Sequence, residues 1–87
     1  MYYVYLLESK EKRNWYIGYS SDLRKRIQNH MSGNGGQTTS RQNDWELIYY
    51  ESYRSEDDAR HREHNLKLRA NAFNQLKMRL SKSLKTD

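Results

Sequence analysis

The stretches YYVYLL at residues 2–7 and WYIGYS at residues 15–20 decide the fold of this chain. Both are rich in aromatic and β-branched residues, which favour strands. The polar segment 8–14 separates them, so the pattern predicts an antiparallel hairpin with a long loop. Each strand also carries a tyrosine, Tyr5 in the first and Tyr16 in the second, whose hydroxyl could take part in chemistry.

A short basic helix is expected directly after the hairpin. Asp22 offers N-cap chemistry, and Leu23, Ile27 and Met31 form one apolar stripe over about ten residues. The segment 32–44 has no large apolar side chain until Trp45 begins the next strand, so it predicts a loop.

The strongest predicted strand covers residues 45–53. Strict alternation would place Trp45, Leu47, Tyr49 and Tyr53 on one face, with Ile48 and Tyr50 on the other. Acidic residues then open a helix expected over 55–69, and a last helix is expected over 71–83. The predicted order is β-β-α-β-α-α, an α/β (α+β) fold.

The composition indicates one small domain over residues 1–87, without a membrane-spanning run or a recognisable leader. Only 34% of the residues are hydrophobic, but eight Tyr, two Trp and one Phe argue against disorder. The absence of cysteine excludes disulfides and thiolate metal sites and suits a cytoplasmic protein. Nothing in the sequence indicates the oligomeric state.

Basic residues exceed acidic ones, 16 to 11, and they concentrate near the C-terminus. Between residues 60 and 85 there are eight Lys or Arg and one acid. This surface favours a polyanionic partner, nucleic acid and above all DNA. The candidate nucleic-acid-binding residues are Lys67, Arg69, Lys77 and Arg79, followed by Lys82 and Lys85.

Two side chains of the first helix could handle phosphate. Arg26 and His30 lie four residues apart, beside the apolar stripe and not opposite it. An arginine can bind a phosphate with two hydrogen bonds, and a histidine can move a proton near neutral pH. A snorkelling arginine and a surface histidine explain the same pattern equally well.

Glu63 is the most informative acid. Ala59, Leu66 and Ala70 surround it at helical spacing, so its carboxylate is expected on the apolar stripe of the helix. A buried charge needs a partner, which could be the guanidinium of Arg26, a tyrosine hydroxyl or a metal ion.

A zinc site on the same helix is a less well supported hypothesis. His61 and His64 flank Glu63, but neighbouring helical positions point about 100° apart, so His64 and Glu63 do not converge easily. The five residues Tyr5, Tyr16, Arg26, His30 and Glu63 instead provide the groups for metal-assisted hydrolysis of a phosphodiester.

With these residues in this order, the chain resembles a compact GIY-YIG endonuclease domain of the small stand-alone kind found in bacteria. Tyr3-Val4-Tyr5 corresponds to the first motif, with Tyr for Gly and Val for Ile, and Tyr16-Ile17-Gly18 is the second motif intact. Segment 45–51 resembles the third strand of stand-alone members. The resemblance covers roughly residues 2–80 and implies a three-stranded antiparallel sheet flanked by helices.

The resemblance also implies roles for the candidate site residues. A single Mg²⁺ or Mn²⁺ would bind at Glu63, and Arg26 would contact the scissile phosphate. Tyr5 would be the general base, while Tyr16 and His30 would orient water or phosphate.

The sequence therefore predicts a metal-dependent endonuclease acting on DNA. A non-catalytic nucleic-acid-binding module would use the same basic surface. A protein-interaction domain with exposed tyrosines fits the aromatic excess but not the charge asymmetry.

Overall fold

The computed structural model describes residues 1–9, 14–31 and 45–80. The side chain of Met31, the predicted loop 32–44, and the basic residues Lys82 and Lys85 lie outside the described part. The described elements are β1 (Tyr2–Ser9), β2 (Trp15–Ser20), α1 (Leu23–Met31), β3 (Trp45–Tyr53), α2 (Glu56–Leu68) and α3 (Ala70–Arg79). The predicted order β-β-α-β-α-α is confirmed.

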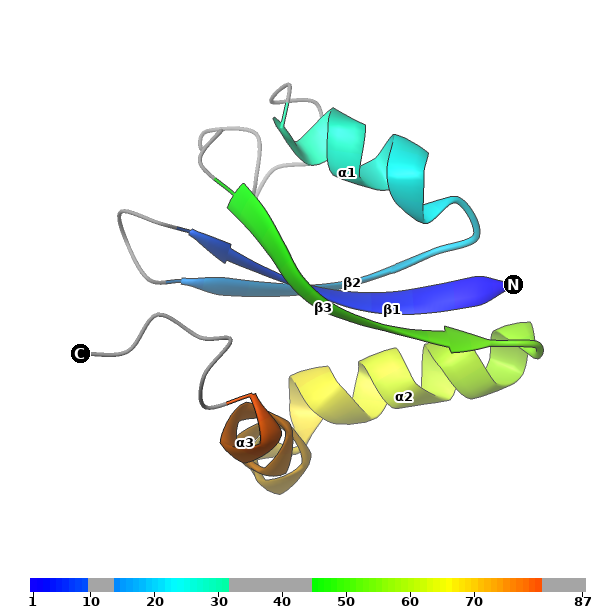
Figure 1. Ribbon diagram of the computed structural model, residues 1–87. Coiled ribbons are helices and arrows are strands. Elements are labelled where there is room, and N and C mark those ends of the chain that lie inside the picture. Colours follow the sequence, from blue (N-terminus) through cyan, green and yellow to red (C-terminus); the bar gives the residue numbers. More distant parts are fainter. Residues whose placement is uncertain (10–13, 32–44, 81–87) are drawn as a thin grey trace.

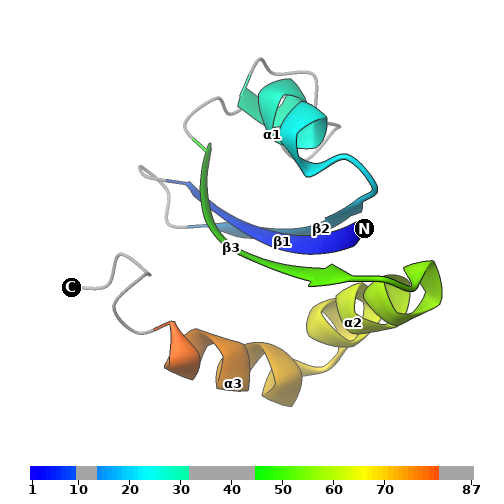
Figure 2. The same cartoon turned by 45° about the vertical axis from the view of Figure 1, so that its right-hand side comes forward.

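The strands form one antiparallel sheet in the order β2-β1-β3, with β1 in the centre. Helix α1 covers one face of this sheet, while α2 and α3 cover the other (Figure 1 and Figure 2). The three-stranded antiparallel sheet with flanking helices is therefore confirmed. None of the described helices is long and apolar enough to cross a membrane.

Each face of the sheet has its own apolar core because the central strand alternates between them. On the α1 face, Tyr5 and Leu7 are buried together with Trp45, and Leu23 and Ile27 of α1 pack on them. The expected inward stripe of the first helix is thus confirmed for its two described members. The opposite core is built around Val4, Ala59, Leu66 and Leu76.

A β-bulge in β3 changes which side chains share a face. Ile48 has no partner in β1, because the register moves from Leu47 directly to Tyr49 between two consecutive β1 residues. An extra residue shifts the alternation of everything beyond it. Trp45 and Leu47 consequently pack on the α1 face, whereas Tyr49 packs on the α2 face. The expectation that these side chains share one face was wrong.

The helix boundaries follow their caps. The carboxylate of Asp22 accepts the backbone N–H of Lys25 at 3.1 Å, and the hydroxyl of Ser55 accepts the N–H of Asp58 at 3.4 Å. Arg69 adopts an extended backbone (φ −114°, ψ 104°) and separates α2 from α3. The predicted apolar stripe of α2 therefore ends before Ala70, which is exposed.

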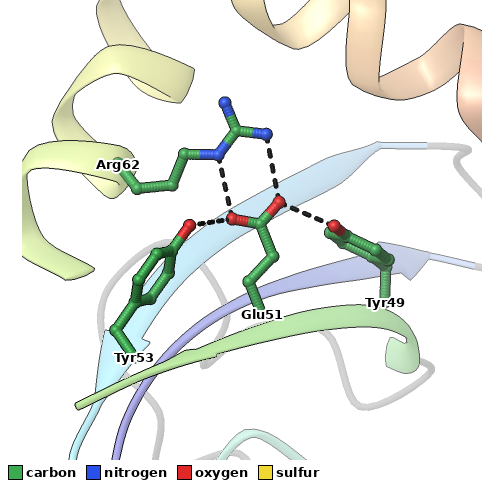
Figure 3. Close-up of polar contacts among 4 residues, drawn as sticks. All are labelled: Tyr49, Glu51, Tyr53 and Arg62. Carbon is green, nitrogen blue, oxygen red and sulfur yellow. Dashed lines mark hydrogen bonds and ion pairs between the residues drawn. The ribbon is translucent and has the colours of Figure 1, made fainter. Parts of the chain in front are cut away.

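A partly buried polar cluster ties α2 to β3 (Figure 3). The carboxylate of Glu51 accepts hydrogen bonds from Nε and Nη2 of Arg62 at 2.9 and 3.0 Å. It also accepts the hydroxyl of Tyr49 at 2.6 Å and the hydroxyl of Tyr53. Burial would raise the pKa of Glu51, but these hydrogen bonds outweigh it and hold the pKa below its usual value. Arg62, counted above in the basic surface, is therefore committed to a structural pair.

Candidate active site

The centre of the site is a hydrogen bond between Tyr5 and His30. Tyr5 occupies the middle of β1 and is 2% exposed, while His30 lies at the end of α1 and is fully buried. The phenolic oxygen lies 2.9 Å from Nε2 of the imidazole. Twenty-five residues separate the two in sequence, so the packing of α1 on the sheet creates this pair.

Gly18 makes room for the Tyr5 ring. It is opposite Tyr5 in the neighbouring strand β2. A Cβ atom at this position would lie only 2.3 Å from Cζ and from the hydroxyl oxygen of Tyr5. The glycine of the second motif is therefore required by a side chain of the first, because the tyrosine crosses directly over it.

Tyr16 and Trp45 complete an aromatic enclosure around the pair. The ring centroids of Tyr16 and His30 are 5.0 Å apart, and those of Tyr16 and Trp45 are 6.4 Å apart. Tyr5 lies 6.3 Å from Tyr16. These tilted and edge-on contacts fix the orientation of the imidazole, so His30 is not the surface histidine that a structural reading of α1 would give.

The enclosure keeps both members of the pair uncharged near neutral pH. Burial raises the pKa of Tyr5 strongly, the neighbouring Tyr16 adds to this, and the charge of Arg26 opposes it. Burial also lowers the pKa of His30, with a further contribution from Arg26. With its ring proton on Nδ1, neutral His30 can accept the Tyr5 hydroxyl proton through Nε2. Tyr5 is thus a base only if His30 takes that proton.

Arg26 and Glu63 lie close enough to influence Tyr5, but they do not pair with each other. The guanidinium of Arg26 lowers the pKa of the Tyr5 hydroxyl and the carboxylate of Glu63 raises it. Arg26 is exposed, and Glu63 is 21% exposed and pairs with Lys67 at 3.1 Å, one turn along α2. Among the described residues, no ion pair joins Arg26 to Glu63, so the purely structural pairing of these two was wrong.

The donor set around Glu63 fits one kind of metal site. No group of three His, Cys, Asp or Glu side chains converges within residues 1–9, 14–31 and 45–80, and His61 and His64 are exposed. Mg²⁺ commonly binds through one or two carboxylates while water and substrate phosphate complete its coordination. The single, partly exposed carboxylate of Glu63 therefore suits a cation shared with a phosphate substrate, provided that the ammonium of Lys67 moves away.

The basic surface is narrower than the sequence indicates. Arg60 pairs with Glu56 at 3.3 Å and stacks on the ring of Tyr19 at 4.4 Å. Like Arg62 and Lys67, it is partly neutralised by an acid.

Three of the four predicted nucleic-acid-binding residues form no ion pair within the described part of the chain. Arg69 is exposed at the junction of α2 and α3. The ammonium of Lys77 lies over the rings of Trp15 and Phe73, at 4.9 and 4.8 Å. Arg79 lines a small cavity beside Glu51.

Sequence reasoning missed the partners that support the site. A glycine inside a strand often marks a close approach of another group, so Gly18 indicated such a contact. The sequence alone did not show that the group is the Tyr5 ring. Trp45 gave no signal of its own, because its face depends on the bulge at Ile48.

Comparison with known proteins agrees with this geometry. The family model described as the GIY-YIG catalytic domain matches residues 1–77. The UPF0213 protein BH0048 of Halalkalibacterium halodurans is 35% identical over 66 residues, which are 76% of this chain and 69% of that protein. The UPF0213 protein CPE1444 of Clostridium perfringens is 32% identical over 87 residues, covering 100% of this chain and 91% of that protein.

A solved structure is also similar. The solution NMR structure of the UPF0213 protein BH0048 from Bacillus halodurans matches with a TM-score of 0.54 and 35% identity, over 87% of this chain and 82% of that chain. The sheet order, the spacing of the two motifs and the match over 77 residues lead to one conclusion. This chain belongs to the family of GIY-YIG catalytic domains.

Proposed function

We propose that this protein is a metal-dependent endonuclease that hydrolyses phosphodiester bonds in DNA. The buried hydrogen bond between Tyr5 and His30 is the observation that supports the proposal most directly. It provides a proton-transfer pair, and the charges of Arg26 and Glu63 both act on its tyrosine hydroxyl, so a cation and a carboxylate are available in the same region for phosphodiester hydrolysis. The family match supports a catalytic role over a purely binding one.

In this mechanism Arg26 binds a non-bridging oxygen of the scissile phosphate with its guanidinium. The attacking water gives its proton to the oxygen of Tyr5, while the Tyr5 hydroxyl proton passes to Nε2 of His30. The water oxygen forms a bond to phosphorus as the bond from phosphorus to the leaving oxygen of the strand breaks, and the leaving oxygen takes a proton from solvent. Tyr16 holds the imidazole in place through ring contact. A divalent cation at the carboxylate of Glu63 would neutralise negative charge on the phosphate when it is bound.

The proposal is tested by nicking of supercoiled plasmid in Mg²⁺, in Mn²⁺ and in EDTA. We expect nicking by the parent protein with either metal and none in EDTA. Tyr5→Phe removes only the hydroxyl and should lower the rate by roughly 10²–10⁴-fold, the usual cost of losing a general base. A parent protein that binds DNA and never nicks it would refute the enzyme and leave a binding module.

Glu63→Gln tests the metal ligand without a large change of shape. We expect loss of nicking, retained DNA binding, and a free energy of unfolding within about 1 kcal/mol of the parent, because the ion pair of Glu63 within the described residues is with the exposed Lys67. Glu56→Gln is the matched control, since it removes an acid of the same helix that pairs with Arg60. If both variants nick like the parent, Glu63 is not the metal ligand.

A further inference from the structure

A second cavity opens on the α1 face of the sheet, beside the Tyr5–His30 pair. It has a volume of about 550 Å³, within the range of pockets that hold one small ligand. Neither the proton-transfer pair nor the predicted metal ligand lines it. We call it the base pocket and define it by the six lining residues used below: Tyr3, Arg24, Ile27, Gln28, Leu47 and Tyr50.

The base pocket is built from the same elements as the candidate active site. Tyr50 in β3 is directly opposite Tyr5 in the sheet register, and Gly18 in β2 is opposite Tyr5 on the other side. Two strand spacings, roughly 10 Å, therefore separate the backbone at Gly18 from the backbone at Tyr50. Helix α1 lines the pocket through Arg24 and carries His30 one to two turns later. A nucleic-acid strand whose scissile phosphate is bound by Arg26, two residues after Arg24 on the same helix, would bring a neighbouring nucleotide to the pocket.

The pocket has the chemistry of a stacking site. Tyr50 is 53% exposed, although large aromatic residues are usually buried. It is held edge-on against the ring of Tyr3, with centroids 6.1 Å apart and an interplanar angle of 66°. Exposed aromatic side chains stack on nucleobases regardless of their identity.

The remaining lining distinguishes a nucleobase from a purely apolar ligand. Ile27 and Leu47 form an apolar floor, and the amide of Gln28 can both donate and accept a hydrogen bond. Arg24 adds a cation that can contact the backbone of the same nucleotide, while the carboxylate of Asp22, which also lines the pocket, caps the first turn of α1. A net charge of +5 favours a polyanion over an uncharged or cationic partner.

We infer that the base pocket receives one unpaired nucleobase of the substrate strand, next to the phosphate bound by Arg26. A base stacked inside a duplex has both ring faces covered by its neighbours and cannot stack on Tyr50, so the pocket selects nucleic acid with an unpaired or extruded base near the cleavage point. The inference rests on the proposed function insofar as the substrate is a nucleic acid.

The test is equilibrium binding in EDTA, where no cleavage occurs. The probes are a fully paired DNA duplex and the same duplex with one unpaired 2-aminopurine. We expect the parent protein to bind the second probe more tightly and to quench its fluorescence. Tyr50→Leu should weaken binding of the unpaired probe by about 5- to 150-fold, as loss of one stacked base does, and leave binding of the duplex unchanged.

Matched variants keep the result interpretable. Tyr19→Leu removes a partly exposed tyrosine from the opposite face, where it packs with Tyr2, and should bind both probes like the parent. Gln28→Ala changes an exposed helical side chain in the pocket and should reduce the preference for the unpaired probe without altering the fold. If Tyr50→Leu and Gln28→Ala both stay within twofold of the parent, the inference is refuted.

Plasmid nicking by the parent protein in Mg²⁺ separates this inference from the proposed function. Nicking without any Tyr50-dependent binding of the unpaired base would overturn the base pocket and leave the nuclease. Tyr50-dependent binding without nicking would support the base pocket and overturn the nuclease.

Discussion

Replacing Gly18 by alanine should destabilise this protein, although alanine normally costs less than glycine in a strand interior. The added Cβ would lie 2.3 Å from Cζ and the hydroxyl of Tyr5 and 2.8 Å from Cε2. Ordinary contact for such an atom begins near 3.4 Å, so the ring must move by about 1.1 Å, the difference between 3.4 and 2.3 Å. That movement would strain the 2.9 Å hydrogen bond to His30.

The expected change in the free energy of unfolding caused by Gly18→Ala combines three effects. Overpacking a well-filled core costs about 1–3 kcal/mol, and losing one buried hydrogen bond costs about 1 kcal/mol. Relief of the conformational freedom of glycine returns about 0.5–1 kcal/mol. The net change in the free energy of unfolding is therefore about 1–3 kcal/mol. For a domain of this size, 1 kcal/mol lowers the Tm by about 4–8 °C.

Urea denaturation of a double-mutant cycle measures this effect and identifies its cause. In a Tyr5→Leu background the three clashing ring atoms are gone, so Gly18→Ala should then be neutral or slightly stabilising. Tyr5→Phe keeps the Cζ atom, so the clash should persist in that background. Equal costs of Gly18→Ala in the parent and in Tyr5→Leu would refute the reasoning.

Three further outcomes follow from the described contacts. Hydrogen bonds lower the pKa of Glu51 in the folded state, so the stability that they provide should be lost as the pH falls below 4.5. In urea titrations at pH 7, Glu51→Gln should be about 1–3 kcal/mol less stable than the parent, because it leaves Arg62 without its ion pair. Burial lowers the pKa of His30, so nicking rates measured across pH should be level near pH 7 and should decrease below pH 6.5 as the imidazole becomes protonated. The nicking rate of His30→Gln should not show this decrease at low pH. Affinity for duplex DNA should fall steeply with salt concentration. Replacing Lys77 and Arg79 by Gln should reduce the slope of log K against log salt by about 1–2. An unchanged slope would show that DNA does not bind at these two residues.

The local pattern of the sequence determined the elements and their order. The richness of 2–7 and 15–20 in aromatic and β-branched residues predicted the hairpin, and the helical spacing of Leu23 and Ile27 predicted the inward stripe of α1. These signals work because the periods of strands and helices are properties of a few consecutive residues. The same motifs made the family recognisable, because each motif lies within one strand or helix and can be identified from consecutive residues.

The partners of the key side chains depended on tertiary structure. The pairing of strands β1 and β3 set the bulge at Ile48, and the bulge moved Trp45 to the face of the candidate site. The sequence offered Arg26 as the partner of Glu63, yet the folded chain pairs Glu63 with Lys67. That pair is local, one turn apart on α2, whereas Tyr5, Tyr16 and His30 lie far apart in sequence, so only the packing of α1 against the sheet decides that they meet.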